Sequence, residues 1–196
     1  MTASATGIII LAAGSSSRLG LPKQLLEFNG RSLLRHAGDV AIGARSAEVL
    51  AVIGFESDRM KHELDDLPVR ILKNDRWEEG IASSIRLGLT SLPKETQAAV
   101  LMLCDQPFVN SELLVRLISS CTPAKPIAAA GYGGTSGVPA CFDHAIFPEL
   151  LKLQGDSGAK SIIRHDPSRT ATLPFPDAAI DIDTMFDFKK HLTPGP

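Results

Sequence analysis

An apolar strand that runs directly into a glycine- and serine-rich loop is the feature that most constrains the fold of this chain. Residues 7–13 are all apolar or glycine, and Gly14 follows them. A segment that is apolar at every position is typical of a strand buried on both faces, as in a parallel sheet. Parallel strands need long crossover connections, which are usually helices. The segment therefore predicts an α/β fold.

Four further apolar runs support this expectation, at residues 49–53, 69–72, 98–103 and 126–130. Apolar residues at helical spacing lie between the runs, at 33–41, 81–89 and 113–118, and Asn110 or Ser111 is the expected N-cap of the third helix. Strands that alternate with helices predict a mostly parallel, Rossmann-like sheet. Right-handed crossovers then give a three-layer α/β/α sandwich.

The pattern changes after residue 131. Residues 131–137 are rich in glycine and predict a flexible loop, and residues 138–142 are a candidate strand. Helices are expected near 144–153 and 159–165. Short segments at 170–173 and 179–182 follow, and a last helix begins at Met185.

Charge and composition exclude several classes of protein. The 196 residues carry a net charge of −2, so the strong basic field of a nucleic-acid binder is absent. No apolar run reaches the ~18 residues of a membrane span, and no signal peptide is apparent, so we expect a cytoplasmic protein. Three widely spaced cysteines without a C-x-x-C motif indicate neither a disulfide framework nor a zinc site.

The loop that follows the first strand has the composition of a phosphate site. Small residues from Gly14 onward let backbone N–H groups approach an anion, and Arg18 and Lys23 add positive charge. Neither standard phosphate motif is present, because Ser16 interrupts G-x-G-x-x-G and the spacing does not match a Walker loop. The alternative is an ordinary strand-to-helix turn with two surface cations.

Acidic residues follow two other segments. Asp105 comes after the 98–103 run and so lies at the same sheet edge as the phosphate loop, where Mg²⁺ would offset its repulsion of a phosphate. Asp181 and Asp183 are spaced to share one face of a strand, and either is a candidate metal ligand. The alternatives are a turn role for Asp105 and a helix cap at Asp183 or Thr184.

Two further loops are candidate ligand sites. Residues 74–85 follow the third apolar run and open a helix with small side chains, which would admit a flat ring. Residues 155–160 also lead into a helix and resemble a second anion loop. Simple helix starts, with Asp156 or Ser157 as the cap in the second case, are the alternatives.

In combination, these motifs resemble those of the MobA/MocA-like nucleotidyltransferases, which act on molybdenum cofactor. The first motif is L-A-A-G-x-S-x-R-x-G-x-P-K-Q over 11–24, and C-D-Q-P, G-D-x-G-A and D-I-D-T follow from residues 104, 155 and 181. The guanylyl branch typically has L-A-G-G in the first loop and Asp before the lysine, whereas this chain has Ala13 and Pro22. It therefore resembles the cytidylyl branch, which serves hydroxylases of the xanthine dehydrogenase type.

The resemblance implies a fold of the nucleotide-diphospho-sugar-transferase type in one domain over 1–196, with residues 7–110 as the nucleotide half and 111–191 as the acceptor half. It implies catalytic roles for Lys23, Arg18 and Asp105, and a Mg²⁺ site at Asp105 and Asp183. The nucleotide-binding residues that it implies are Leu11, Ala12, Ala13, Gly14, Ser16, Arg18, Lys23, Asn74, Gly80, Ser83 and Asp105. The acceptor-binding residues are Gly155, Asp156, Gly158 and Lys160, where the family often has Arg in place of Lys160.

The implied reaction transfers CMP from CTP to the terminal phosphate of molybdopterin or molybdenum cofactor and releases pyrophosphate. A phosphate nucleophile is already anionic near neutral pH, so no general base is required. The alternatives are transfer from GTP or another nucleotide, and a non-catalytic carrier of the cofactor. A hydroxylase or its chaperone is the expected protein partner; no nucleic acid or membrane partner is expected.

Overall fold

The strand order of the central sheet determines which loops meet at one edge. The structure is a computed structural model that describes residues 5–17 and 19–192. Within these residues seven strands form one sheet in the order β5-β4-β1-β6-β8-β7-β9. Every neighbouring pair is parallel except the two that involve β8, which runs antiparallel to β6 and β7. The strands are β1 (Thr6–Ala12), β4 (Glu48–Ile53), β5 (Arg70–Lys73), β6 (Ala98–Leu103), β7 (Ile127–Tyr132), β8 (Thr135–Asp143) and β9 (Thr170–Pro174).

Strand β1 shows why the apolar runs become central strands. All seven of its residues are buried. Because alternate side chains of a strand point to opposite faces, Ile8 and Ile10 contribute to the hydrophobic core on one face and Ile9 and Leu11 to the core on the other. Such a strand is stable only where helices cover both faces of the sheet.

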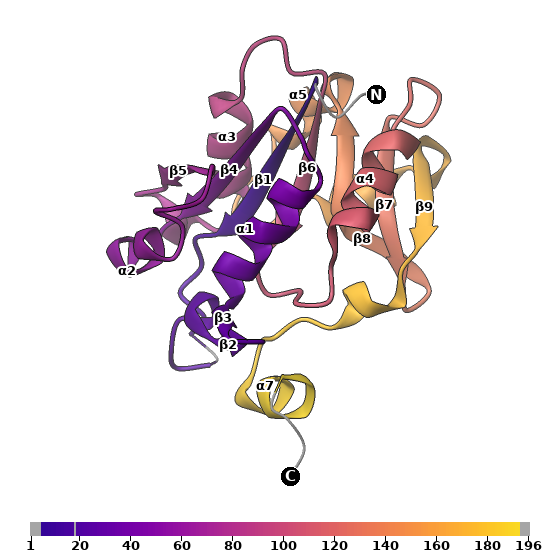
Figure 1. The fold of residues 1–196 in the computed structure, drawn as a ribbon. Helices are drawn as coiled ribbons and strands as arrows, with labels where there is room; N and C mark the ends of the chain where they lie inside the picture. The colour runs from indigo at the N-terminus through magenta and orange to yellow at the C-terminus, as the bar shows by residue number, and fades with distance from the viewer. Residues whose placement is uncertain (1–4, 18, 193–196) are drawn as a thin grey trace.

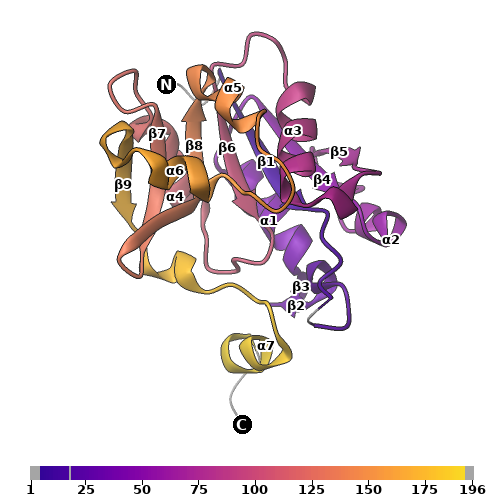
Figure 2. The same ribbon diagram turned by 180° about the vertical axis from the view of Figure 1, so that it is seen from behind.

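Helices do cover both faces, as Figures 1 and 2 show. The face toward the viewer in Figure 1 carries α1 (Leu33–Gly43) and α4 (Ser111–Ser120). The opposite face, seen in Figure 2, carries α3 (Ile81–Ser91), α5 (Phe147–Leu150) and α6 (Lys160–His165). The expected three-layer α/β/α sandwich with a mostly parallel sheet is confirmed.

Side-chain caps fix two helix starts near the functional edge of the sheet. Asn110 caps α4, as expected, and accepts a hydrogen bond from a first-turn N–H at 2.9 Å. Thr184 and Asp187 form a reciprocal capping box at the start of α7 (Met185–His191). Thr184 thus takes the capping role, which leaves the neighbouring Asp183 carboxylate for another contact.

Short elements connect the layers, and several were not predicted. The short helix α2 (Ser57–His62) and the antiparallel pair of β2 (Glu27–Phe28) and β3 (Arg31–Ser32) were not predicted. The helix expected near 144–153 consists of one 3₁₀ turn and one short α-helix. These elements are η2 (Lys23–Leu25), β2 (Glu27–Phe28), β3 (Arg31–Ser32), α2 (Ser57–His62), η3 (Trp77–Glu79), η4 (His144–Ile146), η5 (Pro167–Arg169) and η6 (Pro176–Ala179).

The glycine-rich segment 131–137 is not the flexible loop that we expected. Strands β7 and β8 continue through it and join at Gly133 and Gly134, whose φ angles are +55° and +73°. Two consecutive residues with positive φ form a tight hairpin turn, which glycine permits without steric cost. The hairpin reverses the chain and makes β8 antiparallel. Residues 179–182 form no strand, and no described helix is long and apolar enough to cross a membrane.

Candidate active site

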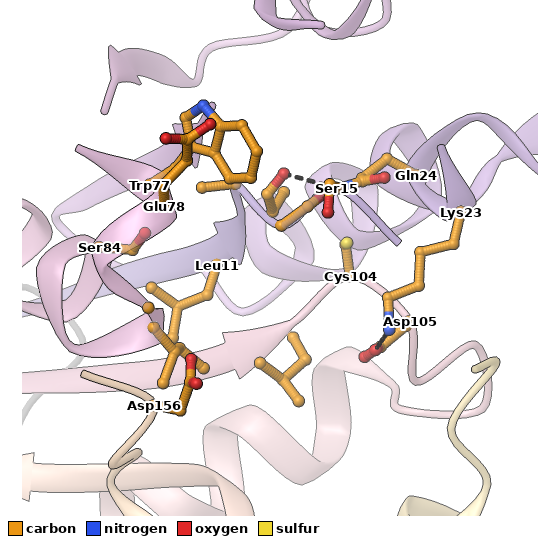
Figure 3. Close-up of a pocket in the computed structure, with 16 residues that line it drawn as sticks. Leu11, Ser15, Lys23, Gln24, Trp77, Glu78, Ser84, Cys104, Asp105 and Asp156 are labelled. Atoms are coloured by element: carbon orange, nitrogen blue, oxygen red, sulfur yellow. Dashed lines mark hydrogen bonds and ion pairs between the residues drawn. The ribbon is translucent and has the colours of Figure 1, made fainter. Parts of the chain in front are cut away.

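The carboxyl ends of β1 and β6 lie side by side at one edge of the sheet. The two strands are parallel, and Leu11 is in register with Leu103, so the loops that follow them meet. Ligands of open α/β sheets bind at this edge. A cavity of about 380 Å³ lies here (Figure 3). It is lined by Leu11, Ala12, Ala13, Gly14, Ser15, Lys23, Gln24, Trp77, Glu78, Gly80, Ile81, Ser84, Leu103, Cys104, Asp105 and Asp156.

The buried side chain of Gln24 holds the loop after β1. Gln24 is only 1% exposed, and its Nε2 donates hydrogen bonds to the carbonyl oxygens of Ala12 at 2.9 Å and Gly14 at 2.7 Å. Ser16 Oγ donates to Gln24 Oε1 at 3.3 Å and accepts from the backbone N–H of Lys23 at 3.1 Å. These bonds join the loop to the segment that carries Lys23.

The ammonium group of Lys23 lies between two carboxylates that are distant in sequence. Its Nζ donates to Asp105, just after β6, and to Asp183 Oδ1 at 2.8 Å. Burial lowers the pKa of Lys23, but the charge of Asp105 and the hydrogen bonds to both carboxylates outweigh burial and raise the pKa above its ordinary value. Lys23 is therefore fully charged at neutral pH, and the trio carries a net negative charge.

Asp105 has the properties of a metal ligand. It is 6% exposed, and its Oδ1 is buried without a hydrogen-bond partner among the described residues. Leaving a buried acceptor unpaired is costly, and a cation would satisfy it. The described residues contain no metal-binding group of three or more His, Cys, Asp or Glu side chains. Mg²⁺ commonly uses one or two carboxylates together with waters and substrate phosphates, so Asp105 and Asp183 fit such an ion.

Asp181 lies near this pair and lines a second pocket. Partial burial and the charges of Asp105 and Asp183 raise the pKa of Asp181 to about 6, although a hydrogen bond with Gln106 acts in the opposite direction. The mutual repulsion shows that the three carboxylates share one electrostatic environment. Lys23 offsets part of this negative charge, and a divalent cation would offset more of it.

The polar residues around the start of α3 fall into two groups. Gly80 and Ser84 line the cavity, whereas Asn74 and Ser83 do not. Asn74 is 4% exposed and donates to Ser83 Oγ at 2.8 Å and Ser84 Oγ at 2.9 Å. Gly80 has φ +93°, and a Cβ atom there would lie 2.4 Å from the backbone of Gly155. Glycine at position 80 thus lets the two loops meet.

A smaller pocket of about 210 Å³ adjoins the cavity and contains most of the predicted acceptor residues. Asp156, Gly158 and Lys160 line it, and Lys160 Nζ lies 5.9 Å from the centre of the Tyr132 ring. Gly155 instead supports the loop, because its carbonyl accepts a hydrogen bond from the first turn of α3. The pocket and the cavity share a wall made of Leu11, Ile81, Leu103 and Asp156.

The structure thus brings most of the sequence-predicted residues to one edge and adds others. Ser16 joins the loop to Lys23 without lining either space, and Arg18 lies outside the described residues. Sequence reasoning missed Ser84, which is one residue beyond the predicted Ser83. It assigned no functional role to Trp77, which lines the cavity. It also assigned no role to Ser15, Gln24, Gln106 or Tyr132.

Comparison with known proteins decides the family. Residues 8–171 match the MobA-like NTP transferase domain. The chain belongs to this family. It is a nucleotidyltransferase, and its seven-stranded sheet has the fold of the nucleotide-diphospho-sugar transferases. All the residues that line the cavity at the ends of β1 and β6 lie within the matched segment.

Individual relatives match the domain over most of its length. The chain is 29% identical over 188 residues to nicotine blue oxidoreductase of Paenarthrobacter nicotinovorans, covering 90% of this chain and 91% of that protein. It is 25% identical to a probable molybdenum cofactor guanylyltransferase of Nostoc sp., covering 91% and 86%. The crystal structure of Rv0371c from Mycobacterium tuberculosis H37Rv has a TM-score of 0.83 and 30% identity, covering 97% and 99%.

Metal binding has been observed in this structural group. A structure of Rv0371c in complex with manganese resembles this chain with a TM-score of 0.78 and 28% identity. The chain is thus a nucleotidyltransferase of a family in which one relative is named a molybdenum cofactor guanylyltransferase.

Proposed function

We propose that the protein transfers CMP from CTP to the terminal phosphate of molybdopterin or molybdenum cofactor and uses Mg²⁺. The observation that carries this proposal is the placement of Lys23 between Asp105 and Asp183 at the wall of the nucleotide cavity. A cation and two carboxylates beside a small-residue loop are suited to a metal-bound triphosphate. In this proposal the nucleotide half comprises residues 7–110 and the acceptor half residues 111–191.

The chemistry requires positioning and charge neutralisation rather than a covalent group on the protein. An oxygen of the acceptor phosphate forms a bond to the α-phosphorus of CTP, and the bond to the β-phosphate oxygen breaks in line, so that pyrophosphate leaves with the electron pair. Burial raises the pKa of the Cys104 thiol to about 12, which keeps it protonated and unsuited to be a nucleophile. Lys23 stabilises the charge that develops on the leaving group.

Asp105 and Asp183 would hold Mg²⁺, which supplies Lewis-acid stabilisation of the phosphates when it is bound. The chain's own contribution is to hold Asp105 at the cavity wall, to hold Asp183 against the other side of Lys23, and to keep Lys23 charged. Arg18 is a further cation for the triphosphate in this proposal. Together these groups would hold CTP and the acceptor phosphate in a near-attack arrangement, which removes much of the entropic barrier.

The size of the side chain at position 13 supports CTP as the donor. Ala13 lines the cavity and is buried, whereas the guanylyl branch of the family typically has glycine at this position. The extra methyl group reduces the space for the base, which favours a pyrimidine over a purine. The Nostoc relative is named a guanylyltransferase, so GTP is the donor against which CTP must be compared.

The smaller pocket supports a separate acceptor site. Its volume of about 210 Å³ is below the roughly 300–1,000 Å³ typical of pockets for drug-sized ligands, so it suits one ring system. Lys160 supplies a positive charge at the wall, although it lacks the bidentate geometry of the arginine often found there in the family. A hydroxylase of the xanthine dehydrogenase type, or its chaperone, is the proposed recipient of the product.

The test uses α-labelled CTP and GTP side by side, with Mg²⁺ and molybdopterin or its molybdenum-loaded form. We expect label to move from CTP to the pterin, and label from GTP alone would overturn the donor choice. A parallel reaction with nicotine blue and a chemical reductant, with and without the protein, tests the activity named for the Paenarthrobacter relative. Protein-dependent reduction of nicotine blue without nucleotidyl transfer would refute the proposal, and nucleotide binding without transfer would favour a carrier.

A further inference from the structure

Three consecutive carbonyl groups, at the end of β1 and in the loop that follows it (the nucleotide loop, residues 13–17), accept hydrogen bonds from other parts of the chain. The oxygens of Ala12 and Gly14 accept hydrogen bonds from Gln24 Nε2 at 2.9 and 2.7 Å. The oxygen between them, on Ala13, accepts from the backbone N–H of Phe55 at 3.1 Å. Every carbonyl from position 12 to position 14 therefore has a fixed direction before any nucleotide binds.

The direction of the carbonyls also fixes the N–H groups. In a planar trans peptide the C=O and the following N–H point in opposite directions. The N–H of Ser15 consequently points away from the Gln24 amide that holds the Gly14 oxygen. Among the described residues, the N–H groups of Gly14 and Ser15 donate to no backbone carbonyl in the loops and turns. Both residues line the nucleotide cavity, where such N–H groups suit an anion.

We infer that Gln24 is a positioning residue for nucleotide binding, which acts through the loop after β1. One amide with two N–H donors reaches two carbonyls that are two residues apart, and its oxygen accepts from Ser16 Oγ. Ser16 in turn accepts from the backbone N–H of Lys23. Gln24 thus fixes the position of the backbone of Lys23 relative to the loop after β1. The inference rests on nucleotidyl transfer by the family and does not depend on CTP as the donor.

The chemistry of position 24 explains why an amide is needed there. The side chain is 1% exposed, so its polar atoms have almost no access to water. A methionine of similar shape offers no donor, and it leaves the Ala12 and Gly14 carbonyls free to turn. Ala12 is 2% exposed, and its buried carbonyl without a partner would be costly, so the end of β1 and the loop after it would rearrange to regain a hydrogen bond. The N–H groups would then lose the directions that suit the phosphates.

The test measures nucleotide binding directly, without an acceptor. Trp77 is the single tryptophan of the chain and lines the nucleotide cavity, so its fluorescence reports on this site. We expect Gln24→Met to raise the Kd for the Mg²⁺ complex of CTP by about tenfold or more, as for the loss of a buried hydrogen-bonding group. In turnover, the KM for the nucleotide should rise more than kcat falls, because the loop contacts the nucleotide before and during reaction.

A matched variant separates positioning from stability. Asn110→Ala removes the cap of α4 and lowers the melting temperature, but it leaves the nucleotide loop intact. Its Kd for the nucleotide should equal that of the wild-type protein. A Gln24→Met protein with a lowered melting temperature and an unchanged Kd would overturn the inference.

A second substitution covers the case in which Gln24→Met does not fold. Gln24→Asn keeps the amide but is one methylene shorter, so it cannot reach both carbonyls. The same tenfold or larger increase in Kd is expected for Gln24→Asn, and wild-type affinity would overturn the inference. If the wild-type protein binds GTP and not CTP, the donor proposal fails, and the same variants test Gln24 with GTP.

Discussion

Replacing Lys23 with methionine should have opposite effects on metal binding and on nucleotide binding. Lys23 Nζ hydrogen-bonds to both carboxylates that are proposed to hold the metal. Without nucleotide, a metal ion must displace this ammonium group from Asp105 and Asp183. With nucleotide, the triphosphate offers the ammonium group an alternative partner. Lys23→Met should therefore bind the metal alone more tightly and the metal–nucleotide complex more weakly.

The expected magnitude follows from the geometry. Two unit charges 4 Å apart attract by about 4 kcal/mol at an effective dielectric constant of about 20. The side chains of Lys23 and Asp183 are 19% and 33% exposed, so solvent screening removes much of this energy. After screening, a free-energy cost of about 1.4 kcal/mol for displacing the ammonium group from the carboxylates corresponds to a tenfold change in the Kd for the metal ion. We expect Lys23→Met to bind Mn²⁺ about tenfold more tightly than the wild-type protein when nucleotide is absent.

Electron paramagnetic resonance of free Mn²⁺ measures this affinity, first without nucleotide and then with it. Lys125→Met is a suitable control, because Lys125 is exposed and its Nζ contacts the Ser168 carbonyl in a different part of the fold. It should leave both affinities unchanged. Equal or weaker Mn²⁺ binding by Lys23→Met in the absence of nucleotide would refute the reasoning.

Three substitutions test other contacts. Asp105→Asn removes the buried carboxylate, and nucleotidyl transfer should fall at least about 100-fold, as for the loss of one key electrostatic group; near-normal turnover would exclude Asp105 as a metal ligand. Gly80→Ala places a Cβ atom 2.4 Å from Gly155 and should lower the free energy of unfolding in urea by about 1–3 kcal/mol; an unchanged midpoint would contradict this. The hydrogen bonds from Arg169 lower the pKa of Glu149. The stability that this pair contributes, under about 1 kcal/mol for a partly exposed pair, is present above the unfolded pKa and lost as pH falls through the folded pKa. Glu149→Gln should therefore lower the free energy of unfolding at pH 7 and leave it unchanged in acid. A difference in this free energy between the variant and the wild-type protein that stays the same at both pH values would contradict a contribution from the pair.

Local signals were sufficient to predict most of the fold. The continuous apolar runs became β1, β4 and β6 because a buried parallel strand needs apolar residues on both faces. The N-cap at Asn110 was predicted because a short polar side chain before an apolar stripe is a local signal. The direction of β8 was missed, because Gly133 and Gly134 were interpreted as part of a loop instead of a hairpin turn. Helix α2 is too short to show a clear helical period.

The candidate site was predicted only in part, because it depends on contacts between distant residues. Parallel strands explain why Asp105 faces the phosphate loop, and the motifs indicated Lys23. Sequence spacing does not show that Lys23 contacts both Asp105 and Asp183, which lie 82 and 160 positions away. The buried amide of Gln24 gave no local signal, because a glutamine beside a lysine is equally typical of a surface.

In the proposed function, the wall shared by the two pockets couples the choice of donor to the choice of acceptor. Leu11, Ile81 and Leu103 contribute to both spaces, and Asp156 lines both. A substitution at any of these positions alters the shape of both sites at once. A change of acceptor that arises from substitutions in this wall would therefore also change nucleotide selectivity. An engineer who wishes to alter only one specificity should begin with residues outside the wall, such as Tyr132 on the acceptor side or Trp77 on the nucleotide side.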